Sequence, residues 1–310
     1  MLLKGRWKHR PFFFFGTFKE MESKKHTVNR RALLKTSSLA ILGLSFPSIS
    51  WSAQNTNNPS VLPYNDNIPQ HFPNIAPEII AEVVGKSHFD LDGVKALVEK
   101  RPELSRSVWE WRFGDFESAI GAASHVGRRD IAIYLMNQGA RPTLFTFAML
   151  GHFNVVKSAI EAAPGIQEAT GPHGISLLDH AYAGKRMKDN MTTTEMEHLE
   201  LTIDYLSGLG NASGTKYLNV SPEEQQKYLG DYKYGNGETE GFTIGVNMRK
   251  LLSLGPIGGF GGALYKIGDN LFTYNGTPSV TITFNIQDGE VKSLTLTEPE
   301  ITLTAEKVSG

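Results

Sequence analysis

The chain has 310 residues, of which 40% are hydrophobic and 20% charged, with 31 glycines, 15 prolines and no cysteine. This composition is typical of a globular protein of about two domains, and it excludes a collagen-like chain and any site built on cysteine. The formal net charge of -1 averages two unlike parts, because residues 1–53 hold 10 Lys and Arg against 2 Asp and Glu. The remainder, with 21 basic against 30 acidic residues, carries about −9. A charge of that sign argues against nucleic-acid binding, which needs Lys and Arg to neutralise phosphates.

The first 53 residues have the order of an export signal. A basic segment precedes an apolar run, 39–46, which is too short to cross about 30 Å of hydrocarbon, and small residues follow it. Its basic part contains the adjacent pair Arg30 and Arg31, followed by Leu33, Leu34 and Lys35. With these motif residues the segment resembles a bacterial twin-arginine export signal. The resemblance implies a periplasmic protein that meets the membrane only through the signal, if the signal stays uncleaved; a chance arginine pair beside a core helix is the alternative.

Translation from Met21 would give a more ordinary signal and would leave residues 1–20 untranslated.

Residues 54–76 are rich in Asn and Pro, which predicts an extended polar linker. The domain boundaries that follow are a signal region over 1–53, the linker over 54–76, a helical region over 77–212 and a β-domain over 213–310.

Two segments of the helical region, 127–140 and 151–163, align place by place. Each has a glycine, a basic residue or His, two spacers and then pairs of apolar residues at helical spacing, which predicts the second helix of a two-helix unit. Less regular copies surround them. The pattern resembles the ankyrin family, which implies an α-solenoid of about four irregular repeats over 77–212. A generic helical bundle is the alternative.

After Pro222 the sequence alternates between apolar and polar residues over short runs, which predicts strands. Asp269-Asn270, Asn275-Gly276 and Asp288-Gly289 separate successive runs where two-residue hairpin turns need positive φ. We therefore expect a small antiparallel β-barrel or sandwich. The order of Tyr228-Leu229-Gly230-Asp231-Tyr232 and Val280 to Asn285 resembles the lipocalin-like β-domain often found behind serine β-lactamase-type hydrolases.

No motif predicts a catalytic residue, a metal site or a cofactor. Ser213 and Lys216 have Ser-x-x-Lys spacing, but they follow a turn and no Lys-Thr-Gly accompanies them. The histidines show neither a His-Glu-x-x-His motif nor a pair four residues apart, so a metal site has no local support. The histidines considered are His71, His88, His125, His152, His173, His180 and His198.

Two predicted loops carry candidate partner-binding residues. Trp109, Trp111, Arg112 and Phe113 fall in one loop and His173 in another, and aromatic and Arg residues dominate binding hot spots. The ankyrin resemblance implies that such loops bind a protein partner, whereas two Trp residues straddling a short hairpin are the structural alternative. The function expected from the sequence is therefore an exported, non-enzymatic protein-binding module. The alternative is that the β-domain binds a small apolar ligand or serves as an accessory to a hydrolase.

Overall fold

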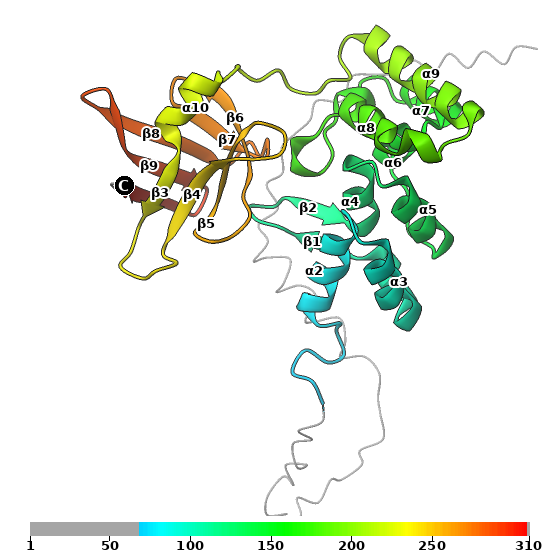
Figure 1. Ribbon diagram of the computed structural model, residues 1–310, viewed down its shortest axis with the longest axis horizontal. Helices are drawn as coiled ribbons and strands as arrows, with labels where there is room; N and C mark the ends of the chain where they lie inside the picture. Colours follow the sequence, from blue (N-terminus) through cyan, green and yellow to red (C-terminus); the bar gives the residue numbers. More distant parts are fainter. Residues whose placement is uncertain (1–67, 309–310) are drawn as a thin grey trace, which may run out of the picture. The chain divides into compact units, whose positions relative to one another are not determined.

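The computed structural model describes residues 68–308, and residues 66–310 form one compact unit (Figure 1). The export-signal residues Arg30 to Lys35 and most of the expected linker lie outside the described residues. The periplasmic location therefore stays a prediction.

Nine α-helices occur in the described residues, and all but the last precede residue 210. None of the helices in this part of the chain is long and apolar enough to span a membrane. The helices are α2 (Pro77–Lys86), α3 (Leu91–Lys100), α4 (Ala119–His125), α5 (Arg129–Asn137), α6 (Leu144–Leu150), α7 (Phe153–Ala162), α8 (Leu177–Ala183), α9 (Thr193–Leu209) and α10 (Pro222–Tyr228). Four 3₁₀ segments lie between them: η1 (Pro102–Arg106), η2 (Ile166–Glu168), η3 (Pro172–Gly174) and η4 (Gly184–Asn190).

Side-chain caps fix where several helices begin. Ser118, Ser176 and Ser221 each accept a hydrogen bond from a backbone amide of the first turn, which satisfies a group that the helix itself leaves without a partner. Thr143 and Thr192 open α6 and α9 with reciprocal capping boxes. These local signals are the reason that helices form at these places whatever the larger arrangement is.

The expectation of an ankyrin-type solenoid is wrong. The aligned segments do form helices, α5 and α7. The helices around them vary from 7 to 17 residues, and the links between helices include short loops, 3₁₀ segments and a β-hairpin. In a solenoid each repeat contacts only its neighbours. Here α4 packs against α2, α6 and α8, and α6 also contacts α9.

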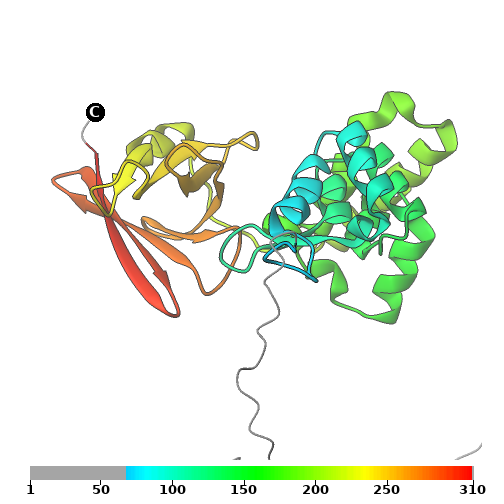
Figure 2. The same ribbon diagram turned by 90° about the horizontal axis from the view of Figure 1, so that it is seen from below.

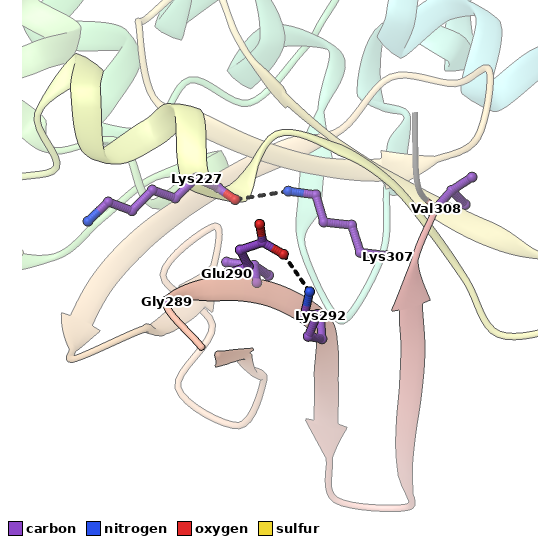
Figure 3. Close-up of a pocket in the computed structure, with 7 residues that line it drawn as sticks. Lys227, Gly289, Glu290, Lys292, Lys307 and Val308 are labelled. Atoms are coloured by element: carbon purple, nitrogen blue, oxygen red, sulfur yellow. Dashed lines mark hydrogen bonds and ion pairs between the residues drawn. The ribbon is translucent and has the colours of Figure 1, made fainter. Parts of the chain in front are cut away.

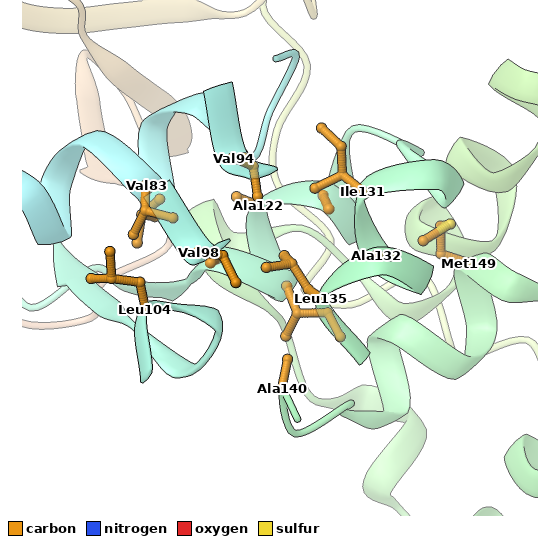
Figure 4. Close-up of a cluster of buried hydrophobic side chains, with 14 of the residues drawn as sticks. Val83, Val94, Val98, Leu104, Ala122, Ile131, Ala132, Leu135, Ala140 and Met149 are labelled. Atoms are coloured by element: carbon orange, nitrogen blue, oxygen red, sulfur yellow. The ribbon is translucent and has the colours of Figure 1, made fainter. Parts of the chain in front are cut away.

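The apolar core of the helical region is divided as well. One buried cluster extends from α2 to α6 and includes Val83, Leu135 and Met149 (Figure 4). A second cluster joins α6 to α9 and includes Leu177 and Leu199. The two clusters share α6, and α4 packs against α2, α6 and α8, so the helices do not stack as a row of repeats along one core.

A two-stranded hairpin interrupts the helices. It consists of β1 (Val108–Glu110) and β2 (Phe116–Ser118), which pair antiparallel with Trp109 opposite Glu117. The hairpin enters α4 directly through the cap at Ser118. A residue on β2 is therefore held rigidly against the start of a helix.

The C-terminal part is a closed, eight-stranded antiparallel barrel. Its strand order is β10-β3-β4-β5-β6-β7-β8-β9. Figure 2 shows this part of the ribbon in yellow to red. Of the two architectures expected from the sequence, barrel and sandwich, the structure has the barrel. Its strands are β3 (Gly230–Lys233), β4 (Gly241–Val246), β5 (Leu252–Pro256), β6 (Gly262–Gly268), β7 (Leu271–Tyr274), β8 (Thr281–Gln287), β9 (Glu290–Glu298) and β10 (Ile301–Lys307).

Aromatic side chains fill the barrel. Tyr232, Phe272, Tyr274 and Phe284 are at most 2% exposed, and Tyr228 of α10 packs against this cluster. Small barrels of eight strands are just wide enough for side chains to fill them. The interior is thus a packed core.

Candidate metal centre

Four side chains from four separate segments meet in the helical region. His88 lies in the link between α2 and α3, Glu117 on β2, His125 at the last position of α4 and His173 in η3. One nitrogen or oxygen atom from each lies within 4.8 Å of the others. We call these four residues the histidine–glutamate cluster.

Glu117 is the centre of the cluster. Its Oε1 lies 3.0 Å from His125 Nε2 and 3.4 Å from His173 Nε2, and its Oε2 lies 3.4 Å from His88 Nε2. All three histidines therefore present Nε2 to the same carboxylate.

These three nitrogen–oxygen separations lie in the range of ion pairs and also in that of atoms that share a metal ion. Two ligand atoms that each lie about 2.1 Å from an ion are about 3.0 Å apart at a right angle and about 3.4 Å apart at the tetrahedral angle. The observed nitrogen to oxygen distances of 3.0 and 3.4 Å fall at these two values. Imidazole nitrogen and carboxylate oxygen are common ligands of zinc and other first-row transition ions.

Two atoms of the cluster are buried without a hydrogen-bond partner in the part of the chain that the structure describes. They are Glu117 Oε1 and His125 Nε2, which lie 3.0 Å apart. Glu117 is 0% exposed, and an orphaned buried carboxylate oxygen costs free energy. A cation between these atoms would satisfy both of them.

Hydrogen bonds hold the opposite atoms of His88, His173 and Glu117. His88 Nδ1 contacts the Gly85 carbonyl oxygen at 3.0 Å, and His173 Nδ1 contacts Asp115 Oδ2 at 2.6 Å. Trp111 Nε1 donates to Glu117 Oε2 at 2.7 Å. Metal-binding histidines commonly donate their other ring N–H to a carbonyl or carboxylate, which fixes the ring and leaves the first nitrogen free to bind.

The pKa values of the cluster reflect the pairing of its histidines with Glu117 and Asp115. Burial alone would raise the pKa of Glu117, but the three neighbouring histidines hold that pKa well below its ordinary value. Burial lowers the pKa of His125. Against the effect of burial, the contacts with Asp115 and Glu117 raise the pKa of His173 to about 10. The two carboxylates, one in the cluster and one behind His173, together match the charge of a divalent ion.

His173 has a backbone conformation that non-glycine residues rarely adopt, with φ 60° and ψ 22°. Its own N–H donates to Asp115 Oδ1 at 3.0 Å, and its carbonyl oxygen accepts a hydrogen bond from the Tyr265 hydroxyl at 3.0 Å. Residues in such conformations cost about 1–3 kcal/mol and are concentrated at functional sites. The strained backbone conformation thus occurs at His173, whose imidazole belongs to the histidine–glutamate cluster.

The structure brings two of the sequence-predicted binding residues, Trp111 and His173, to the histidine–glutamate cluster. Trp109 and Trp111 are partly buried against the first hydrophobic cluster, and Trp111 also contacts Glu117. Arg112 Nη1 donates to the Phe260 carbonyl oxygen at 3.1 Å. Phe113 packs edge-on against Tyr274 with ring centroids 5.0 Å apart, and His173 is a member of the cluster itself.

Sequence reasoning missed His88, Glu117 and His125 as a group. They lie on different elements, so no short motif links them. One signal was present: Glu117 is a charged residue two positions before the apolar stretch 119–123, and its side chain is fully buried. A buried carboxylate needs a partner of opposite charge or a metal.

A pocket lies in the barrel region, among residues far in sequence from the histidine–glutamate cluster (Figure 3). It has a volume of about 400 Å³ and is lined by Lys227, Glu290, Lys292 and Lys307 among others. Glu290 pairs with Lys292, and Lys307 donates to the Lys227 carbonyl oxygen. Its glutamate and two of its lysines therefore already have partners, unlike the orphaned atoms of the histidine–glutamate cluster.

Comparison with protein-family models, with curated proteins and with solved structures found no match to this chain. The geometry of the cluster is therefore the basis for the function proposed below.

Proposed function

We propose that this protein binds one divalent first-row transition ion, with zinc as the reference case, through the histidine–glutamate cluster. The observation that carries the proposal is the pair of buried atoms without hydrogen-bond partners, Glu117 Oε1 and His125 Nε2, with His88 and His173 beside them. The two atoms lie 3.0 Å apart without hydrogen-bond geometry between them, so a cation bound by both would satisfy them.

The ligand set is that of a structural metal site, in which the ion stabilises the fold. Four protein ligands complete a tetrahedral zinc shell, whereas catalytic zinc sites keep three protein ligands and one open position. The four ligands come from the α2–α3 link, β2, α4 and η3. An ion bound here ties these four segments together.

The test is a zinc titration of the full, metal-stripped chain against a competing chromophoric chelator. We expect one zinc ion per chain at the cluster. His125→Ala and Glu117→Gln each remove a ligand, so they should weaken binding by more than about 100-fold, beyond the 10–100-fold typical of outer hydrogen-bond partners. Circular dichroism of each variant shows whether the helices persist.

His152→Ala and His198→Ala are the matched controls, because both histidines lie in the helical region outside the cluster. We expect their zinc affinity to stay within about twofold of the unmodified chain. Zinc binding that is lost equally from all four variants, or from none, would overturn the proposal.

The other functional expectations remain proposals. Export by the twin-arginine route concerns residues outside the described part of the chain. Protein binding through Trp109 to Phe113 has less support than metal binding, because the structure engages several of these side chains in internal contacts. Binding of an apolar ligand inside the barrel has little support, because aromatic side chains fill that interior.

A further inference from the structure

A hydrogen-bonded path leads from the histidine–glutamate cluster into the β-barrel. It begins at His173, whose Nδ1 contacts Asp115 Oδ2 at 2.6 Å. The same carboxylate oxygen accepts a second hydrogen bond, 2.7 Å long, from the side-chain amide of Asn275. Asn275 directly follows β7 of the barrel. Asp115 and Asn275 are 8% and 6% exposed, so water screens these contacts little.

The orientation of the Asn275 amide is fixed from its other side. Its Oδ1 accepts the backbone N–H of Ala263, 2.6 Å away on β6. A backbone N–H can only donate, so the oxygen must face Ala263 and the NH₂ group must face Asp115. Asn275 also has a positive φ of 47°, a conformation that Asn tolerates better than most residues.

A second barrel residue holds the same ligand segment. The Tyr265 hydroxyl donates to the His173 carbonyl oxygen at 3.0 Å. The Tyr265 ring stacks on Tyr217 with centroids 4.4 Å apart, and Arg249 donates to its hydroxyl at 2.9 Å. The ring and hydroxyl are thus themselves held in place.

We infer that Asn275 and Tyr265 are positioning residues of the metal centre, so that the barrel supplies its outer hydrogen bonds. This inference rests on the proposed function. Asn275 orients the Asp115 carboxylate, Asp115 orients the His173 ring, and Tyr265 fixes the strained backbone of His173. The barrel thereby sets the affinity of an ion that none of its own residues binds.

The first experiment measures the zinc affinity of Asn275→Gly in the full chain. Glycine tolerates the positive φ and removes only the side-chain amide. Loss of an outer hydrogen-bond partner typically costs 10–100-fold in metal affinity, and we expect at least about 10-fold here. Asn270→Gly is the matched control, because Asn270 also has a positive φ, of 54°, and lies at the opposite end of β7. Its zinc affinity should change by less than about twofold.

A double-mutant cycle separates positioning from general loss of stability. In an Asp115→Asn background the hydrogen-bonded path from Asn275 to His173 is already altered. Asn275→Gly should therefore weaken zinc binding by less than about a further twofold in that background. The ligand-field spectrum of the cobalt(II)-loaded protein should also differ between Asn275→Gly and Asn270→Gly, since only the former releases the His173 ring.

Tyr265→Phe keeps the ring and its stacking and removes only the hydroxyl, so it tests the inference where Asn275→Gly does not fold. We expect several-fold weaker zinc binding, with Tyr234→Phe, at an exposed tyrosine, as the control. If the unmodified chain binds zinc while the Asn275 and Tyr265 variants match their controls, the inference is wrong and the proposed function stands. If the unmodified chain binds no zinc, the proposed function itself fails.

Discussion

Trp111 illustrates how one side chain of this protein can be noticed in the sequence and still be misassigned. An aromatic residue in a loop suggests a partner-binding surface. In the structure its indole N–H points at Glu117 Oε2, 2.7 Å away, and its ring packs against the first hydrophobic cluster. The residue type was informative, but the direction of its side chain is set by the β1–β2 hairpin and by α2.

Replacement of Trp111 by Phe keeps an aromatic ring and removes the donor to a buried carboxylate. Hydrogen bonds to charged groups contribute about 1.5–3 kcal/mol, so the free energy of unfolding should fall by about 2 kcal/mol. Zinc affinity should fall by about 10-fold. Denaturant unfolding and the chelator titration measure the two effects.

Trp109→Phe is the control for this change, since Trp109 packs against the same hydrophobic cluster. Its zinc affinity should be unchanged. Equal losses of zinc affinity in both variants would show that packing, and not the bond to Glu117, is what matters at Trp111.

Among the secondary-structure elements, helix ends were the most predictable feature of the chain. The glycine that opens each aligned segment was recognised from its place in the pattern, and Gly151 indeed ends α6 with a positive φ of 74°. The packing of the helices was not predictable in the same way. A repeat of apolar positions specifies that a helix has one buried face, but it does not specify which helix covers that face.

Gly151→Ala tests how closely the C-terminal end of α6 packs against α9. A Cβ at this position would lie 2.8 Å from the Leu199 Cα in α9, in addition to the strain of a positive φ. Gly139 has a φ of 87° and open space where a Cβ would lie, so Gly139→Ala isolates the backbone strain. We expect losses of about 1 kcal/mol for Gly139→Ala and about 3 kcal/mol for Gly151→Ala, because overpacking adds to the strain.

Urea unfolding of the two variants gives the comparison. Similar losses for both would mean that the contact between α6 and α9 is looser than the structure shows, and that only the backbone conformation matters at these glycines.

At the scale of the whole molecule, the sequence predicted two kinds of structure in the correct order within residues 68–308, helices followed by antiparallel strands. Asn270 and Asp288 lie in two-residue hairpin turns as predicted, and both have positive φ. The two-residue turn predicted at Asn275-Gly276 is wrong, because a longer link joins Tyr274 of β7 to Thr281 of β8. The histidine–glutamate cluster was not predictable, because its members become neighbours only when the hairpin, two helix ends and η3 have packed together. Spacing rules detect a metal site only when a single element supplies several of its ligands.

Binding of a single ion by three imidazoles and one carboxylate is tested most directly by X-ray absorption spectroscopy of the zinc-loaded full chain. We expect a first shell of four nitrogen and oxygen atoms at about 2.0–2.1 Å, with the outer-shell scattering of three imidazole rings. His152→Ala should leave this spectrum unchanged, and His173→Asn should remove one ring from it. A shell of oxygen atoms with one imidazole or none would contradict metal binding by this cluster.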